Sequence, residues 1–312
     1  MSDPVVVVVG DANPDLVLTG DVVPRFGQAE QLLDSAALVL GGSAAIVACG
    51  LARLGVTTAI VAVVGDDEFG RATRTLLEDA GVDTRWLRTD ARTPTGVSVI
   101  LSAESRAILT HPGTIATTDA TALPTLDELA GVRHVHSASL FLQPLLAPTL
   151  PGYLAALRER GATTSCDTNW DPTERWELAG ATIAACDVFL PNTAELAAIT
   201  GVDDHDEAVR RFTDDGATVA LKNGAAGGIA WAPDGLRVSA PGIAVDVVDT
   251  TGAGDTFDAG FISGWVEGAA LDECLARAVA AGSLSTRGLG GTATQPTRAE
   301  LDAVLSTQRG PA

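Results

Sequence analysis

The alternation of short apolar runs with helical patterns is the feature that most constrains the fold of this chain. Strands are predicted where β-branched residues cluster, and helices where apolar residues recur at helical spacing. The predicted strands cover residues 5–9, 58–64, 132–136, 163–167, 187–190 and 218–221. The predicted helices cover residues 43–54, 68–80, 148–160, 194–200 and 206–214. Such alternation indicates a mostly parallel sheet with helices on both faces, which is an α/β fold.

Five further segments with strand-like sequence lie outside this alternation. Residues 228–232, 236–239 and 243–248 are separated by Pro-Asp-Gly and Pro-Gly turns, which predicts an antiparallel edge. Residues 14–41 and 92–111 contain strand-like stretches without a helix. We interpret these two segments as a small β-sheet lid, discontinuous in sequence, on a single domain spanning residues 1–312; the alternative is an extension of the main sheet.

Charge and cysteine content exclude several classes of protein. The 312 residues carry a formal charge of −20 and contain a single lysine, Lys222. The resulting field would repel nucleic acids and anionic membranes. The four cysteines are widely spaced without a metal-binding pattern, the sequence lacks a long apolar run, and no basic leader precedes the first strand. We therefore expect a cytoplasmic protein with reduced cysteines, no zinc site and no membrane span.

A loop of small residues joins the last predicted strand to a helix. Residues 249–257 read DTTGAGDTF, with the strand ending at Val248 and the helix beginning near Gly254. Glycine lets the backbone come close to a ligand, and amides at a helix N-terminus attract anions. The loop therefore predicts a phosphate site that needs no lysine, with the amides of Gly252, Ala253 and Gly254 as donors.

Asp255 is the unusual residue of this loop, because a carboxylate repels a phosphate. One interpretation makes it an N-cap of the helix. The other makes it a general base that accepts the proton of an attacking hydroxyl while the neighbouring amides stabilise the transferring phosphoryl group. The helix terminus is expected to keep its pKa low, so that it is ionised at neutral pH.

Four motifs in order resemble the PfkB family of ribokinase-like carbohydrate kinases. DTTGAGDTFDAGF resembles the C-terminal signature of that family, and GGSAAI at residues 41–46 resembles its N-terminal signature. Between them, PNTAE at 191–195 resembles the NxxE motif, and LKNGAAG at 221–227 resembles the KxGxxG stretch on the nucleotide side. The resemblance covers nearly the whole chain. It implies a three-layer α/β/α sandwich with a small lid, and ATP-dependent phosphorylation of a primary hydroxyl of a sugar-like substrate.

The resemblance also implies roles for individual residues. On the nucleotide side it implies Asn192, Lys222, Gly224 and Gly227 beside the phosphates, Gly282 near the adenine, and Glu195 with Asn192 holding Mg²⁺ through water. The alternative for Asn192 and Glu195 is a capped helix with a solvated glutamate. Asp249 and Thr251, with the loop at 288–292, resemble a monovalent-cation site, for K⁺ in some members.

On the substrate side the resemblance implies Asn13, Asp15, Gly41, Gly42, Ser43, Arg106 and Asn169, with Asp167 as a further candidate. A homodimer built through the lid is also an expectation from similar kinases.

The match departs from the family pattern at one substrate position. Ile46 stands where the N-terminal signature usually has an asparagine that contacts the substrate. This departure leaves the sugar unidentified and keeps open a non-catalytic sugar- and nucleotide-binding protein on the same fold. A nucleoside kinase of the same family is a second alternative, because GGSAA resembles the start of the adenosine-kinase version of the signature, although the asparagine that normally follows is missing. A Rossmann oxidoreductase and a Walker-type NTPase are disfavoured, because neither glycine motif is present.

Overall fold

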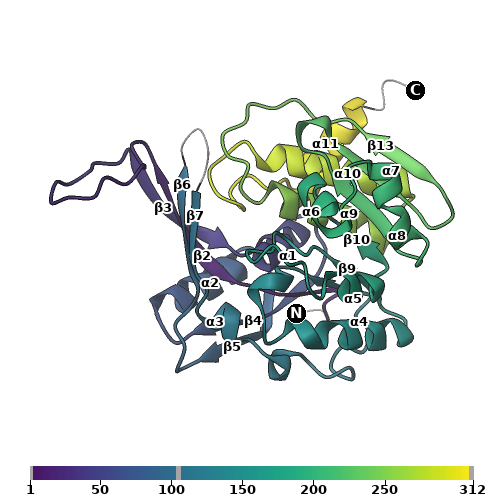
Figure 1. The fold of residues 1–312 in the computed structure, drawn as a ribbon, viewed down its shortest axis with the longest axis horizontal. Helices are drawn as coiled ribbons and strands as arrows, with labels where there is room; N and C mark the ends of the chain where they lie inside the picture. The colour runs from purple at the N-terminus through teal and green to yellow at the C-terminus, as the bar shows by residue number, and fades with distance from the viewer. Residues whose placement is uncertain (1–2, 103–106, 309–312) are drawn as a thin grey trace.

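A nine-stranded sheet forms the centre of the protein, described here from a computed structural model that covers residues 3–102 and 107–308 (Figure 1). The strand order is β13-β12-β11-β10-β9-β8-β1-β4-β5. The parallel strands are β1 (Val6–Val9), β4 (Thr58–Gly65), β5 (Asp83–Asp90), β8 (His134–Ser137), β9 (Thr163–Cys166), β10 (Val188–Phe189) and β11 (Thr218–Lys222). The antiparallel edge consists of β12 (Gly228–Trp231) and β13 (Arg237–Ala240).

Helices cover both faces of this sheet, as the apolar character of its strands requires. In β1, Val6 and Val8 pack into one core and Val7 and Val9 into another, because successive side chains of a strand point to opposite faces. The helices that pack on the first core are α1 (Ser43–Arg53), α2 (Glu68–Asp79), α9 (Ala253–Glu267) and α10 (Leu271–Ser285), with α11 (Arg298–Gln308) on α10. The helices on the second core are α4 (Leu150–Glu159), α5 (Ala179–Ala184), α6 (Thr193–Thr200), α7 (His205–Ala208) and α8 (Arg210–Thr213).

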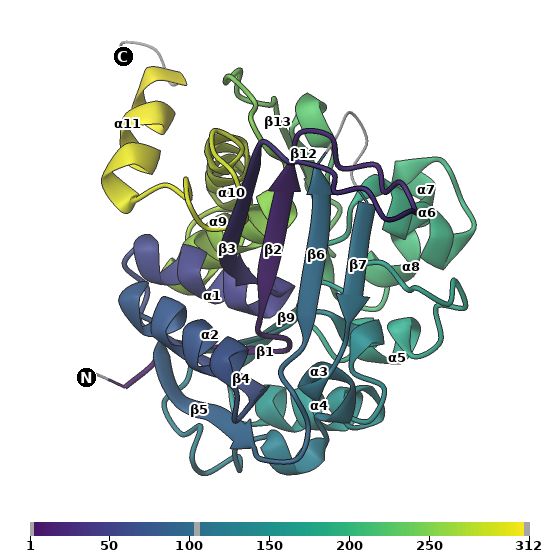
Figure 2. The same cartoon turned by 90° about the vertical axis from the view of Figure 1, so that its left-hand side faces the viewer.

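The lid is a separate four-stranded sheet in the order β3-β2-β6-β7. Its strands are β2 (Asn13–Thr19), β3 (Ser35–Gly41), β6 (Val97–Ser102) and β7 (Ala107–His111), and Figure 2 shows them facing the viewer. The interpretation of these segments as a sheet of their own is confirmed, and the extension of the main sheet is excluded. A short helix, α3 (Thr114–Thr117), follows the lid.

Two expectations about the elements are wrong, and one strand was missed. Residues 243–248 do not form a strand, because Ile243 and Val245 line a cavity and the amide of Val248 donates to the carbonyl of Thr286 (2.8 Å). Residues 206–214 form the two short helices α7 and α8 instead of one. Edge strand β5 was not expected, because its sequence DTRWLRTD is too polar to look like a buried strand.

All four cysteines are buried and free. Within the described ranges, no helix has both the length and the apolar character that crossing a membrane requires.

Candidate active site

Polar side chains from β1, β9, β10 and β11 meet the start of α9 at the carboxyl edge of the parallel strands. The turn before α9 depends on Gly252, whose φ of 70° lies in the left-handed region that glycine adopts without penalty. The amides of Gly252, Gly254 and Asp255 have no hydrogen-bond acceptor among the described residues, whereas Ala253 donates to the carbonyl of Thr250 at 3.2 Å. We name residues 252–255 the anion loop. Its unpaired amides at a helix N-terminus form a site for a phosphate group.

Asp255 does not cap α9. The N-cap is Gly252, without a side-chain hydrogen bond, and Asp255 instead accepts a hydrogen bond on Oδ1 from Ser43 Oγ at 2.5 Å. Burial, together with the charge of Asp167, raises the pKa of Asp255 to about 7, although Ser43 and Lys222 oppose the shift. The expectation of a low pKa is therefore wrong, because the desolvation of this carboxylate outweighs the helix terminus.

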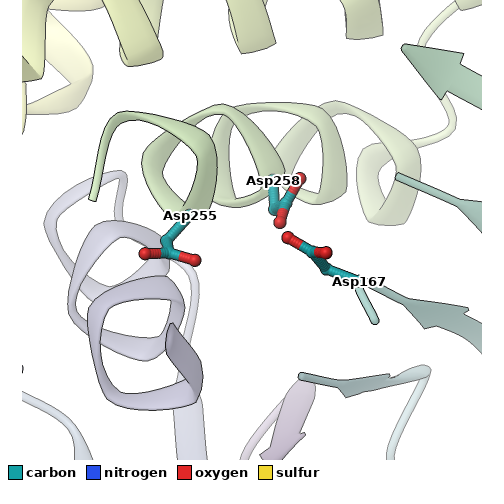
Figure 3. A group of neighbouring side chains, drawn as sticks. All are labelled: Asp167, Asp255 and Asp258. Atoms are coloured by element: carbon teal, nitrogen blue, oxygen red, sulfur yellow. The ribbon is translucent and has the colours of Figure 1, made fainter. Parts of the chain in front are cut away.

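Lys222 lies in an ion cluster beside Asp255. Its ammonium contacts Asp167 at 2.5 Å and Asp258 at 2.9 Å, and only 10% of its side chain is exposed. Figure 3 shows Asp167 and Asp258 pointing toward one another, with Asp255 one turn earlier on α9. The three carboxylates have oxygens within 4.8 Å of one another.

The pKa values of the two partners of Lys222 are shifted in opposite directions. Burial opposes ionisation of Asp167, yet the Lys222 ammonium holds its pKa below the usual range. Burial raises the pKa of Asp258 well above its usual value, against the attraction of the same ammonium. The ammonium of Lys222 is therefore shared between two buried carboxylates.

Asn192 and Glu195 form a capping box at the start of α6. Asn192 Oδ1 accepts from the amide of Glu195, and Glu195 Oε2 accepts from the amide of Asn192, both at 2.9 Å. Glu195 is 4% exposed, so the alternative of a solvated glutamate is wrong. Burial, followed by the charge of Asp167, raises the pKa of Glu195 to about 7. A nearby cation would favour its ionised form.

A cavity of about 540 Å³ lies against the anion loop. It brings together four residues expected on the nucleotide side, namely Lys222, Gly224, Gly227 and Gly282. Its other walls are mainly apolar: Ile243, Val245, Val247, Phe257 and Val279. Gly282 also allows close packing of α10 on α9, since a Cβ there would lie 2.9 Å from the carbonyl oxygen of Ala253. Asn192 is not part of the cavity wall.

The substrate-side residues meet at the base of the lid. Asn13 and Gly41 are paired across β2 and β3, and Asn13 Nδ2 donates to Asp15 Oδ1 at 3.0 Å. A Cβ on Gly41 would lie 2.0 Å from that same oxygen, so only glycine leaves room for the carboxylate. Gly42 precedes α1 with a φ of 85°.

Asn169 and Ser43 connect this region to Asp255. Asn169 Nδ2 lies 3.2 Å from Ser43 Oγ, and Asn169 Oδ1 accepts from the amide of Ser139 at 2.7 Å. Ile46 lies nearby but does not reach into a polar contact: its side chain packs against the backbone of Gly252 and Gly291, where added Cβ atoms would lie 3.1 Å and 2.5 Å from it.

The two remaining expected sites are the one at Asp249 and Thr251 and the one at Arg106. Asp249 Oδ1 accepts from both the amide and the hydroxyl of Thr251, and its Oδ2 accepts from the amide of Gly290, so these residues tie the anion loop to residues 288–292. Arg106 lies outside the described residues.

Sequence reasoning missed two acidic residues and one serine. Asp11 Oδ1 accepts from the amide of Ala44 at 3.0 Å and thereby caps α1. Asp258 is the second partner of Lys222, and Ser139 orients Asn169. The signal for Asp258 was present, since it lies three residues after Asp255 and therefore on the same face of α9.

Comparison with known proteins finds similar carbohydrate kinases along nearly the whole chain. The pfkB family carbohydrate kinase profile matches residues 3–298. An ATP-dependent ribose-1-phosphate kinase of Halopiger xanaduensis is 34% identical over 95% of this chain and 96% of its own. A 2-dehydro-3-deoxygluconokinase of Bacillus subtilis is 31% identical over 86% of this chain and 87% of its own. The structure of Arabidopsis thaliana ribokinase with ribose and ATP superposes with a TM-score of 0.81 at 26% identity, covering 98% and 99% of the two chains.

Proposed function

The chain belongs to the pfkB family of carbohydrate kinases, ATP-dependent enzymes that phosphorylate sugars, and from this premise we propose that Asp255 is its catalytic base. The observation that carries the proposal is the position of this carboxylate. It lies within the anion loop, next to unpaired amides and to the cavity that is large enough for a nucleotide. A base and a phosphate site are therefore held by the same turn of α9.

The reaction follows from these neighbours. Asp255 accepts the proton of a primary hydroxyl of the sugar, whose oxygen forms a bond to the γ-phosphorus of ATP while the bond to the β,γ-bridging oxygen breaks and ADP leaves. The amides of Gly252 and Gly254 donate to the transferring group, where charge accumulates. The apolar walls of the cavity receive the adenine and exclude water from it.

Mg²⁺ fits the charge of this region. Asp167, Asp258, Asp255 and Glu195 lie around a single ammonium, so the cluster carries an excess of carboxylates that a cation would balance. We assign Glu195 and Asn192 to Mg²⁺ through water, since this ion retains several waters in proteins. When bound, Mg²⁺ neutralises charge on the phosphates.

The sugar is held by Asn13 and Asp15 at the base of the lid, because a carboxylate accepts hydrogen bonds from two hydroxyls. Ile46 offers no hydrogen bond at the position where an asparagine is usual, and it is buried against Gly252 and Gly291, so we propose a substrate that receives no side-chain hydrogen bond from this position. Ribose 1-phosphate, ribose and 2-dehydro-3-deoxygluconate, on which the named relatives act, head the panel of sugars to test.

Three finer assignments complete the proposal. Asp249 and Thr251 form the core of a monovalent-cation site for K⁺. The exposed apolar side chains of the lid, Leu38, Ile108 and Leu109, are covered by a second copy in a homodimer. The enzyme acts in the cytoplasm, where its free thiols stay reduced.

A coupled ATP-consumption screen tests the function. Pentoses, hexoses, sugar acids, phosphosugars and nucleosides are compared with and without excess EDTA, and turnover is expected with a sugar and only in the presence of Mg²⁺. Turnover with nucleosides alone would support a nucleoside kinase, and binding without turnover would support the non-catalytic alternative.

Substitution of the base tests the mechanism. Asp255→Asn is expected to lower kcat by a factor on the order of 10² or more, with ATP affinity and folding retained. In the unmodified enzyme, kcat/KM is expected to fall as the pH drops below about 7, because the protonated form of Asp255 cannot accept a proton. A nearly unchanged kcat in this variant would show that Asp255 is not the catalytic base.

A further inference from the structure

The hydrogen bonds around Asp255 contain a chain of donors that begins at a backbone amide. The N–H of Ser139 donates to Asn169 Oδ1 at 2.7 Å. An asparagine side chain has one acceptor atom, the oxygen, and one donor group, the amide nitrogen. The contact with Ser139 therefore fixes the orientation of this amide and leaves Nδ2 facing Ser43 Oγ at 3.2 Å.

The orientation of Asn169 determines the direction of the next hydrogen bond. Because Nδ2 can only donate, Ser43 Oγ accepts from it and keeps its own proton for another partner. That partner is Asp255 Oδ1, at 2.5 Å. The chain of donors therefore runs in one direction, from the Ser139 amide through Asn169 and Ser43 to one oxygen of Asp255.

We propose that Ser43 and Asn169 are positioning residues that hold Oδ1 of Asp255 as a hydrogen-bond acceptor and so reserve Oδ2 for the proton of the substrate hydroxyl. This inference rests on the proposed role of Asp255 as the base. A carboxylate held at one oxygen keeps a single orientation, and general-base catalysis depends on such alignment. Ser43 then acts on the base and not on the sugar, which differs from the substrate contact that the resemblance implies.

The backbone around Asn169 is arranged for this purpose. Asn169 has a φ of 54°, a left-handed conformation that asparagine tolerates better than most residues, and its own amide donates to Asp167 Oδ1 at 2.8 Å. Ser139 follows β8, Asn169 follows β9, and Ser43 begins α1. The chain thus connects three separate elements to the start of α9.

The hydrogen bond from Ser43 also affects the pKa of Asp255, which lies among several charged groups. The carboxylates of Asp167 and Asp11 raise the pKa of Asp255, as burial does, while Lys222 lowers it. Glu195 and Asp258 also interact with Asp255 through their charges. In this mostly acidic setting, the hydroxyl of Ser43 favours the ionised form of the base.

Ser43→Ala is the first test. We expect kcat to fall by roughly tenfold to a hundredfold, the range for losing a hydrogen bond to a charged group. The midpoint of the pH profile of kcat/KM should move to higher pH, because the ionised form of Asp255 has lost a donor. Ser43→Thr retains the hydroxyl and should restore both quantities in large part. Ser263→Ala, which removes a buried hydroxyl from the same helix as Asp255, is the control that should change neither.

Asn169 is tested with two substitutions. Asn169→Gly keeps the left-handed backbone accessible but removes both side-chain contacts, so it should lower kcat without moving the KM for ATP. Asn169→Asp keeps the acceptor for the Ser139 amide and replaces the donor with a second carboxylate. It should move the pH midpoint upward at least as far as Ser43→Ala does.

The outcomes separate this inference from the proposed function. If Asp255→Asn is active, the role of the base is wrong and the inference fails with it. If Asp255→Asn is inactive while Ser43→Ala raises only the KM for the sugar, with kcat and the pH midpoint unchanged, then Ser43 is a substrate contact and only the inference is overturned.

Discussion

Two glycines of the anion loop, separated by one residue, have different structural roles. Gly252 has a left-handed φ, and a Cβ there would lie 2.7 Å from the Cα of Gly291. At Gly254 the backbone is helical, and the nearest atom to an added Cβ is Lys222 Cδ at 3.5 Å, an ordinary contact. The first glycine is therefore required by the fold, whereas the fold leaves room for a Cβ at the second, which the proposed function assigns to phosphate binding.

This difference predicts opposite results for two alanine substitutions. Gly252→Ala should lower the free energy of unfolding by more than about 1 kcal/mol, because a Cβ is strained in the left-handed region. Gly254→Ala should leave it within about 0.5 kcal/mol of the original value and reduce kcat/KM at least about tenfold, by keeping phosphate away from the amide. Urea titration and initial rates measure the two effects. Full activity in Gly254→Ala would contradict the anion loop as the phosphate site.

Lys222 makes a second residue-scale prediction. Removing its ammonium leaves Asp167 and Asp258 buried beside each other without their cationic partner. Lys222→Met should therefore cost about 3–5 kcal/mol of unfolding free energy. The double variant Lys222→Met/Asp258→Asn removes one of the two carboxylates and should recover part of that loss. A stable Lys222→Met protein would show that neither carboxylate needs the lysine.

Sequence patterns located these residues more reliably than they predicted their chemistry. Asp255 is recognisable within GAGD, but its pKa depends on burial and on Asp167, which lies far away in the chain. Lys222 follows an apolar strand as predicted, yet its acidic partners are visible only after β9, β11 and α9 are assembled. Ser139 was missed because its contribution is a backbone amide, which any residue provides.

At the scale of elements, the segment between β13 and α9 forms part of the wall of the cavity beside the anion loop. Buried strands and amphipathic helices were predictable because their periodicity reflects the packing of whole faces. Residues 243–248 have the apolar, β-branched composition of a strand, but Ile243 and Val245 turn into the cavity, and Val247 remains 63% exposed. Their apolar side chains therefore line a cavity, and composition alone does not distinguish a cavity wall from a strand.

This segment should respond to the nucleotide in hydrogen exchange. Its backbone is held at few points, such as the amides of Val248 and Asp249 on the carbonyl of Thr286. Segments with few buried contacts open readily, and a ligand that packs on them slows their exchange. ATP should protect residues 243–250, while peptides of β2 should respond to the sugar. Protection of β2 by ATP alone, without change in 243–250, would place the nucleotide elsewhere.

At the scale of the whole molecule, the formal charge of −20 affects the stability of the fold. The excess carboxylates repel one another in the folded state. Added salt shortens the Debye length and so weakens this repulsion. Part of the same excess is concentrated around Lys222, Glu195 and Asp255. Salt can therefore stabilise the protein in two ways, by general screening or by occupation of the site proposed at Asp249 and Thr251.

The two effects of salt can be measured separately by comparing two cations, choline and K⁺. Raising choline chloride toward about 1 M, where the Debye length is about 3 Å, should increase the free energy of unfolding, because screening needs no specific ion. KCl at equal ionic strength should add a further, saturable increase and raise kcat, and Asp249→Asn should remove only that addition. Equal effects of the two salts would contradict the K⁺ site, and no effect of choline chloride would show that self-repulsion does not limit the stability of the fold.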